Sequence, residues 1–205
     1  MHAKSDCKTK YTTSDLLKGA SYQGIMEWEK AYIEACVDAL QPFGDVLEIG
    51  FGCGYSASHI QTYFPKNHTI IESHLGTSQK AKEWSIHYTN VHLIKDSWQK
   101  ALSQLGIFDA IFFDDYPLQV ALDKSLIKWR YQQEDFLFFL EQCLSSHMRK
   151  GSRFSCFLSE PTSKYGDKVW FEKIITNPFL DYEERRIPVE GPKPHEALVI
   201  TITKK

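Results

Sequence analysis

The residues from Glu48 to Tyr55 combine three glycines with a preceding carboxylate in a pattern that can hold a nucleotide. Gly50, Gly52 and Gly54 follow a short apolar run, and such glycines let the backbone turn sharply and approach a ligand without Cβ clashes. A helix that follows the turn presents unpaired N–H groups at its start. The third glycine comes one residue too early for a G-x-G-x-x-G dinucleotide site. The pattern therefore indicates either a nucleotide-binding loop or only a tight strand-to-helix turn.

Two acidic residues follow the next two predicted strands. Glu72 ends an apolar run about 20 residues beyond the glycines, where an acidic group accepts hydrogen bonds from ribose hydroxyls. Asp96 ends the following run. Each could be a solvated strand terminus, but two acids and a glycine loop at successive strand ends together favour a nucleoside ligand.

A second group of carboxylates could bind or deprotonate a substrate. Asp114 and Asp115 follow a strongly apolar run, and one of them is expected to be only an exposed turn residue because adjacent side chains diverge. In a doubly wound sheet this strand lies next to the first one, so we expect Asp114 beside the glycine loop. Glu27 and Glu29, on the first predicted helix, cannot share a helical face, so one of them is expected to be solvated.

The elements that must position these residues alternate between strands and helices. Helices are predicted at residues 25–40, 55–64, 77–87, 98–105, 134–147 and 168–176, and strands at 45–50, 69–72, 91–95, 108–113, 152–158, 182–188 and 197–203. The near-continuous apolar runs are typical of strands buried on both faces, as in a parallel sheet, whereas the last two strands alternate in polarity. The pattern predicts an α/β doubly wound sheet, mostly parallel with an antiparallel C-terminal edge. Residues 1–22 are expected to be an N-terminal arm or lid, and residues 23–205 a single domain.

The composition excludes several classes of function. With 205 residues and a formal net charge of −2, the chain has no overall attraction to nucleic acid or to anionic membranes. The five cysteines form no C-x-x-C pair and the histidines no metal-binding spacing, so we expect neither disulfides nor a metal site. No secretory signal or apolar membrane span is visible. We therefore expect a cytoplasmic monomer or homodimer whose partners are small molecules.

Four motifs together resemble guanidinoacetate N-methyltransferase and the related fungal protein-arginine δ-N-methyltransferases. They are Trp28-Glu29-Lys30-Ala31-Tyr32, Val46-Leu47-Glu48-Ile49-Gly50-Phe51-Gly52, Ile70-Ile71-Glu72 and Asp114-Asp115-Tyr116-Pro117. Their order and spacing are similar to those of the family over roughly residues 22 to 165. A G-F-G loop followed by D-x-Y-P is much more specific than a glycine loop alone.

The resemblance implies a seven-stranded, Rossmann-like methyltransferase fold that binds S-adenosyl-L-methionine. The residues that it implies for the cofactor are Glu48, Gly50, Phe51, Gly52, Cys53, Gly54, Tyr55, Ser56, Glu72, Ser73, His74, Asp96, Ser97 and Asp114. Those that it implies for the methyl acceptor are Ile25, Glu29, Asp114, Leu158 and Ser159, with Glu29 and Asp114 catalytic. Two carboxylates suit a guanidinium group because they can bind its planar donors, orient one nitrogen and receive its proton.

The chain also departs from the family pattern at three places. Cys53-Gly54-Tyr55 replaces the family's residues after G-F-G, no tryptophan precedes Trp28 to act as the family's lid, and Glu160 stands in the segment that binds the acceptor's carboxylate. The leading hypothesis is methylation of a small guanidino compound, with guanidinoacetate the first candidate. The alternatives are arginine, a protein arginine or another small amine as acceptor, and a non-catalytic module that binds S-adenosylmethionine or another nucleotide.

Overall fold

Alternating strands and helices form the part of the chain that the structure describes. This computed structural model describes residues 22–114, 136–157, 174, 176–189 and 195–205, with the backbone alone described for residues 22–29. The strands are β1 (Asp45–Ile49), β2 (Asn67–Ile71), β3 (Val91–Ile94), β4 (Phe108–Phe113), β5 (Met148–Cys156), β6 (Leu180–Val189) and β7 (His195–Lys204). The helices are α2 (Tyr22–Leu40), α3 (Tyr55–Gln61), α4 (Leu75–Ser85) and α5 (Trp98–Ala101), with a further helical segment at residues 136–142.

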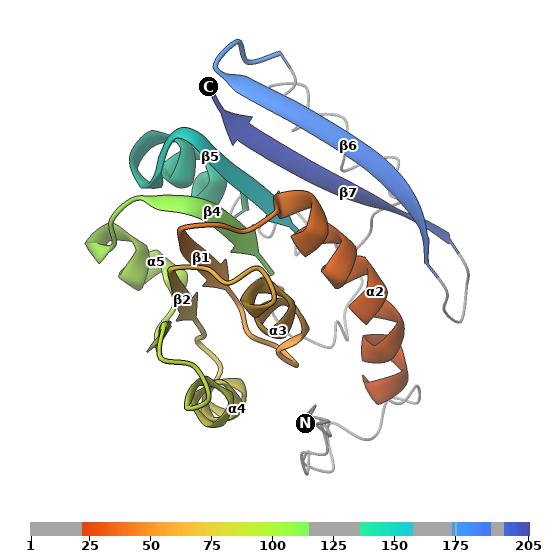
Figure 1. Ribbon diagram of the computed structural model, residues 1–205, viewed down its shortest axis with the longest axis vertical. Coiled ribbons are helices and arrows are strands. Elements are labelled where there is room, and N and C mark those ends of the chain that lie inside the picture. Colours follow the sequence, from red (N-terminus) through yellow and green to blue (C-terminus); the bar gives the residue numbers. More distant parts are fainter. Residues whose placement is uncertain (1–21, 115–135, 158–173, 175, 190–194) are drawn as a thin grey trace, which may run out of the picture.

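The seven strands form one sheet in the order β3-β2-β1-β4-β5-β7-β6 (Figure 1). β1 pairs in parallel with both β2 and β4, and β7 lies antiparallel between β5 and β6. The predicted doubly wound sheet with an antiparallel C-terminal edge is therefore confirmed. Because β2 and β4 flank β1, the segments that follow these three strands lie together at one edge of the sheet.

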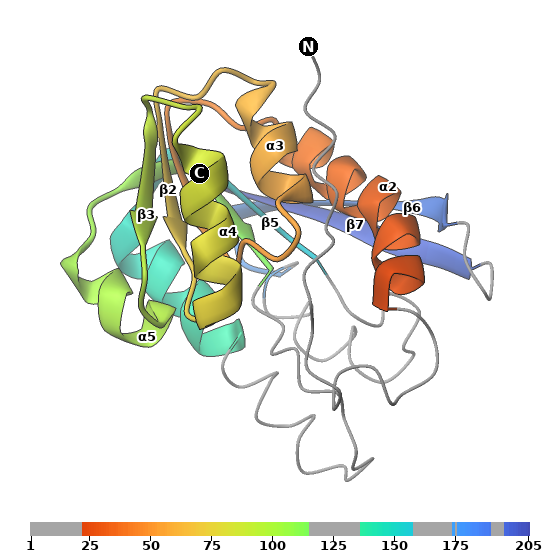
Figure 2. The same ribbon diagram turned by 90° about the horizontal axis from the view of Figure 1, so that it is seen from below.

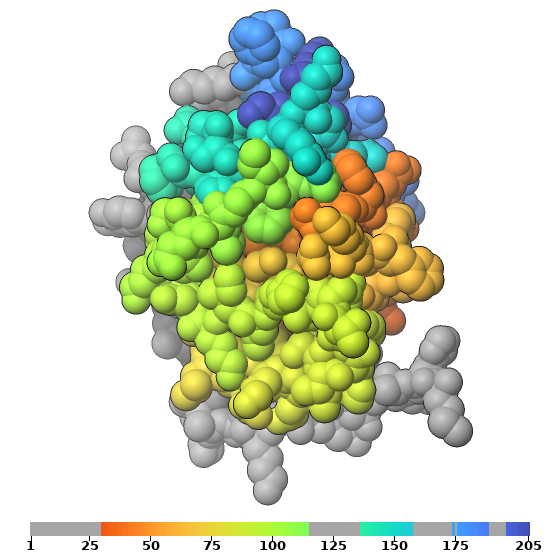
Figure 3. Space-filling model, turned by 60° about the vertical axis from the view of Figure 1, so that its left-hand side comes forward, coloured from red at the N-terminus to blue at the C-terminus, as the bar shows by residue number. Residues whose placement is uncertain are grey.

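Helices cover both faces of the sheet, and the strand residues alternate between them (Figure 2). Leu47 and Ile49 of β1 pack in a core with Trp98 of α5 and Phe139 of the 136–142 segment. Val46 faces the other side, where it packs in a second core with α2 and α3. Figure 3 shows the surface near the β3 edge, where the segments from α4 to α5 (yellow-green to green) run continuously into residues 136–156 (cyan).

The largest differences from the predicted elements occur around β5. The helix predicted at residues 134–147 ends in a π-helical turn at Cys143–His147, and β5 begins at Met148 instead of at residue 152. The pairing of β4 with β5 is irregular here. Phe108 pairs with Met148, whereas Ala110 pairs with Arg153, so β5 has more residues than β4 between these two pairs. The helix predicted at residues 168–176 lies mostly outside the described residues, as does the predicted arm except for Tyr22.

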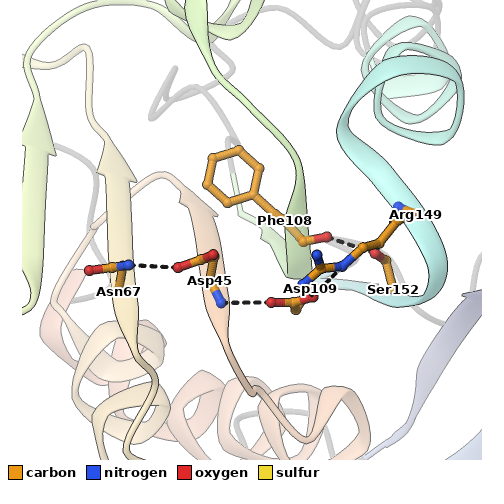
Figure 4. Close-up of polar contacts among 6 residues, drawn as sticks. All are labelled: Asp45, Asn67, Phe108, Asp109, Arg149 and Ser152. Atoms are coloured by element: carbon orange, nitrogen blue, oxygen red, sulfur yellow. Dashed lines mark hydrogen bonds and ion pairs between the residues drawn. The ribbon is translucent and has the colours of Figure 1, made fainter.

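A polar network fixes the amino ends of four strands (Figure 4). Asp109 is buried, and its Oδ2 accepts a 3.0 Å hydrogen bond from the backbone N–H of Asp45, while its Oδ1 accepts one of 2.8 Å from Arg149 Nε. Asn67 Nδ2 in turn donates to Asp45 Oδ1 at 2.6 Å. These contacts hold β1, β2, β4 and β5 in register at the edge opposite the predicted site.

Candidate functional site

The carboxyl ends of β1, β2 and β4 bring the sequence-predicted residues together. The backbone N–H of Gly50 donates to Ile71 O at 2.9 Å, and that of Asp114 donates to Ile49 O at 2.8 Å. Hydrogen bonding thus continues past the ends of the strands on both sides of β1. Asp114 consequently lies beside the start of the glycine loop, which we define as residues 50–55.

The glycine loop has a backbone that only glycine adopts readily. Gly50, Gly52 and Gly54 have φ angles of 84°, 53° and 75°. A Cβ atom at Gly54 would lie 2.7 Å from Cζ of Phe51, so close packing excludes a side chain there. A Cβ atom at Gly52 would meet nothing within 4 Å. The loop is therefore packed on its inner side at Gly54 and open at Gly52, as a loop that receives a ligand must be.

Glu72 connects the end of β2 to this loop. Its Oε2 accepts a 2.9 Å hydrogen bond from the backbone N–H of Phe51, and its Oε1 accepts one of 2.7 Å from the N–H of His74. The side chain is buried, with 7% of the residue surface exposed. Because an ionised carboxylate offers about four lone-pair sites, these two bonds leave it able to accept hydroxyl groups as well.

Four further predicted residues lie on the rim around Glu72 and β3. Ser73 and His74 are exposed, and the ring of His74 accepts a 3.3 Å hydrogen bond from Thr77 N at the start of α4. Ser97 is the residue before α5, and its N–H donates to Asp96 Oδ1 at 2.8 Å. The segments that carry these side chains follow β2 and β3, which are the next two strands beside β1 in the sheet.

Glu48, a predicted cofactor residue, has a side chain that points into the protein. It is fully buried, its Oε1 accepts a short hydrogen bond from Ser56 Oγ, and its Oε2 lies 2.9 Å from His68 Nε2. Sequence reasoning treated His68 as one of several scattered histidines. A signal was present, because His68 is the one titratable residue of β2 and lies two residues before the apolar Ile70.

Two buried thiols lie near Asp114. Burial raises the pKa of the Cys36 thiol far above its ordinary value, and the nearby charge of Asp114 raises it further. Burial likewise raises the pKa of the Cys156 thiol, with added contributions from Cys36 and Asp114. Both cysteines therefore remain neutral thiols at physiological pH. The thiols of Cys36 and Cys156 therefore add no negative charge near Asp114.

The remaining predicted residues are placed only in part. Cys53 and Tyr55 are partly exposed, and Lys30 Nζ lies 5.8 Å from the centre of the Tyr55 ring. Ile25 and Glu29 lie on α2, for which the structure gives the backbone alone at these positions. Leu158, Ser159 and the other residues predicted near them lie outside the described residues, as does Asp115.

The described part of the chain contains neither a cluster of metal ligands nor a candidate membrane-spanning helix. Within it, no three histidine, cysteine, aspartate or glutamate side chains gather as a metal site would require. None of the helices described there is both long enough and apolar enough to cross a membrane.

Solved structures similar to this arrangement include methyltransferases. A putative O-methyltransferase from Klebsiella pneumoniae has a TM-score of 0.61 at 18% sequence identity, over 92% of this chain and 82% of that one. An O-methyltransferase from Bacillus cereus, solved in complex with SAH, has a TM-score of 0.57 at 16% identity, over 93% and 86% of the two chains. The fold is that of class I methyltransferases.

The sequence identifies the family within this fold. The model of the family described as Guanidinoacetate N-methyltransferase matches residues 2–152, and the chain belongs to that family. The cofactor expected from the four motifs, S-adenosylmethionine, is confirmed by this membership and by the fold.

Two fungal relatives are both named Protein arginine N-methyltransferase 2. The one from Candida glabrata is 34% identical over 122 residues, which is 53% of this chain and 29% of the relative. The one from Saccharomyces cerevisiae is 29% identical over 119 residues, which is 52% of this chain and 29% of the relative. The matches thus cover less than a third of the length of these relatives.

Proposed function

We propose that this protein transfers a methyl group from S-adenosylmethionine to a nitrogen of a guanidino group. The observation that carries the proposal is the place of Asp114, whose N–H bonds to Ile49 O directly before the glycine loop. This places Asp114 next to the loop at which we propose that the methyl donor is held. Membership of the guanidinoacetate N-methyltransferase family supports the same reading.

The residues of the carboxyl edge suit the cofactor. The open space at Gly52 allows a ligand to approach the backbone, and Glu72 keeps acceptor capacity for ribose hydroxyls beside the loop. We assign the methionine part to residues 50–56 and the adenine to the rim that carries Asp96 and Ser97. When bound, the cofactor supplies a sulfonium methyl group that is open to in-line attack by a nitrogen.

The acceptor side of the proposal rests on two carboxylates. Positions 29, 33 and 36 lie along one face of α2. Ile33 and Cys36 on that face are buried, and the charge of Asp114 contributes to the raised pKa of the Cys36 thiol. On the basis of this spacing, we assign Glu29 to the acceptor site beside Asp114. A guanidinium has a pKa above about 12 and offers no lone pair, so it must lose a proton as the nitrogen–carbon bond forms.

Asp114 would orient the guanidinium by accepting hydrogen bonds from two of its N–H groups. As the carbon–sulfur bond breaks and the carbon–nitrogen bond forms, the acceptor nitrogen releases one proton to a carboxylate oxygen. The methylated guanidinium would keep its single positive charge, so the second positive charge would leave the site as the released proton, which passes to solvent. Positioning and this proton acceptance are the contributions that we assign to the chain.

The acceptor has two candidates of the same chemistry. Guanidinoacetate is the first, because the matched family bears its name. Arginine, free or within a protein, is the second, because the fungal relatives are named arginine N-methyltransferases. Ile25, Leu158 and Ser159 are proposed to contact whichever acceptor binds.

A methyl-transfer screen with isotopically labelled S-adenosylmethionine tests the proposal. We expect turnover with guanidinoacetate, arginine or an arginine-containing peptide, and none with citrulline, in which a neutral urea replaces the guanidinium. Turnover with citrulline or with a simple amine at the same rate would exclude a site built for guanidinium. Tight cofactor binding without turnover on any acceptor would instead support the non-catalytic alternative.

A further inference from the structure

We propose that His68 is a positioning residue that holds the glycine loop in its cofactor-binding shape. The proposal rests on the cofactor role assigned above to that loop. His68 lies on β2, and its ring is part of a buried polar cluster beside the loop. This cluster, which consists of Glu48, Ser56, Gln61 and His68, joins β1, β2 and α3.

The first observation is a carboxylate that is fully removed from water. The side chains of Glu48 and His68 are both 0% exposed, and burial of an ionised carboxylate is costly unless it is paired. Ser56 Oγ satisfies Oε1. Oε2 lies 2.9 Å from His68 Nε2, although the two atoms are not aligned as a hydrogen bond. Within the described residues, the Nε2 edge of the imidazole is therefore the polar group that lies against the second oxygen, at ion-pair distance without an aligned hydrogen bond.

The second observation is a contact between the other ring nitrogen of His68 and Gln61. Gln61 Nε2 lies 3.0 Å from His68 Nδ1. With the amide nitrogen of Gln61 in this orientation, Nδ1 accepts and the proton is on Nε2, toward Glu48. Register supports the geometry, because Val46 pairs with His68 and Glu48 lies two residues further along on the same face of β1.

The third observation is that the cluster includes residues from both ends of α3, the helix that follows the loop. Ser56 lies in the first turn of α3 and Gln61 is its last residue. Both bind the Glu48–His68 pair, so α3 is attached to β1 and β2 at each end. Because the glycine loop leads directly into α3, any freedom of this helix becomes freedom of the loop.

A second route links His68 to the loop through an aromatic side chain of α4. The Trp84 ring packs edge-on against His68 with centroids 6.4 Å apart, and in a tilted arrangement against Phe51 with centroids 5.5 Å apart. Its Nε1 donates a 3.1 Å hydrogen bond to Ser58 Oγ of α3. Phe51 is a residue of the loop itself, so removal of the imidazole loosens the loop from two sides.

The consequence is a specific effect on cofactor affinity. A loop that is ordered before the ligand arrives loses less conformational entropy on binding. Loss of His68 should therefore weaken S-adenosylmethionine binding, while turnover at saturating cofactor and the affinity for the acceptor stay close to wild type. General damage to the fold would instead reduce the active fraction without changing the dissociation constant.

Calorimetry with S-adenosylmethionine on His68→Leu, His68→Gln and a control variant tests this inference. Gln at this position retains a nitrogen donor near the place of Nε2, whereas Leu does not. We expect the dissociation constant of His68→Leu to rise roughly 10–100-fold, as for residues that orient a ligand-binding group, and that of His68→Gln to rise much less. His147→Leu is the matched control, because His147 is also buried and hydrogen-bonded, to Gly106 O at 2.9 Å, at the opposite edge of the sheet.

Hydrogen exchange of the amides of residues 50–61 provides a readout that needs no cofactor. We expect faster exchange there in His68→Leu but not in His147→Leu. If His68→Leu is too unstable to purify, Glu48→Gln replaces the carboxylate that Ser56 and His68 surround, with little change in volume, and should show the same two effects. Unchanged loop exchange together with unchanged cofactor affinity in the His68 variant would overturn the inference.

Failure of the wild-type protein to bind S-adenosylmethionine would instead refute the proposed cofactor role. The exchange measurement would still decide whether His68 positions the loop.

Discussion

The backbone N–H of Phe51 donates a 2.9 Å hydrogen bond to Oε2 of Glu72, so the carboxylate that ends β2 is tied to the loop that follows β1. The same carboxylate accepts from His74 N with its other oxygen. One side chain therefore sets the distance between the loop and the start of the segment that leads to α4. Glu72 has two functions in consequence, because it shapes the loop and also offers lone pairs to a ribose.

Replacement of Glu72 by glutamine should weaken cofactor binding by more than the loss of one hydrogen bond. The amide NH₂ group of glutamine would face either Phe51 N–H or His74 N–H, and two donors cannot pair. We expect the dissociation constant of S-adenosylmethionine, measured by calorimetry, to rise at least about tenfold, since a hydrogen bond to a charged group contributes about 1.5–3 kcal/mol. Glu83→Gln on the exposed side of α4 is the control and should bind normally.

Alanine substitutions at two glycines with similar backbone conformations should distinguish the cost of backbone strain from the loss of cofactor contact. Gly52 and Gly151 both have positive φ angles, 53° and 86°, and a Cβ atom at either would meet nothing within 4 Å. Alanine at each position should lower the free energy of unfolding by a comparable amount, on the order of 1–2 kcal/mol. Only Gly52→Ala should also weaken S-adenosylmethionine binding. Equal affinities in the two variants would mean that the cofactor does not approach Gly52.

The sequence predicted those parts of the site that depend on local pattern. The glycine loop, Glu72 and Asp114 each follow a recognisable apolar strand, and the doubly wound order of strands then places them at one edge. The start of β5 was missed, because the register change between Phe108 and Ala110 is a property of two strands together.

Contacts between distant segments account for the rest of what was not predicted. The pairing of Glu48 with His68 depends on the register between β1 and β2, and the approach of Cys36 to Asp114 depends on how α2 lies over the sheet. Neither is visible in the spacing of residues along one element. Glu48 was predicted among the cofactor-binding residues because of its motif, and the structure shows that its side chain is fully buried.

A surface cluster between α2 and α3 should give a small, pH-dependent contribution to stability. Partial burial of Asp38 tends to raise its pKa, but hydrogen bonds of 2.7 Å with His59 and with the Tyr63 hydroxyl outweigh this and lower it. Because the pKa of Asp38 is lowered in the folded state, the stabilisation is present above the ordinary aspartate pKa of about 3.9 and is lost as the pH falls through the lowered value.

Denaturant unfolding of wild type and Asp38→Asn over acidic pH measures this contribution. We expect a difference in unfolding free energy of less than about 1 kcal/mol, since the cluster is largely exposed and screened by solvent, and a decrease of that difference below about pH 4. Tyr63→Phe removes one donor, so an NMR titration should show a higher Asp38 pKa in that variant. A difference that grew on acidification would contradict the assigned direction.

Replacement of Asp114 by asparagine should separate catalysis from cofactor binding. The amide keeps the size of the side chain and one acceptor oxygen, but it has no negative charge to hold a guanidinium and cannot accept the proton that must leave during transfer. We expect turnover with the best acceptor to fall about 10²–10⁴-fold while S-adenosylmethionine still binds. Asp181→Asn is the matched control, because Asp181 is an exposed carboxylate on β6 that pairs with Lys205 at 2.7 Å, and its turnover should equal that of wild type. Full activity of Asp114→Asn toward that acceptor would show that this carboxylate neither grips the guanidinium nor takes its proton, and the role would pass to Glu29.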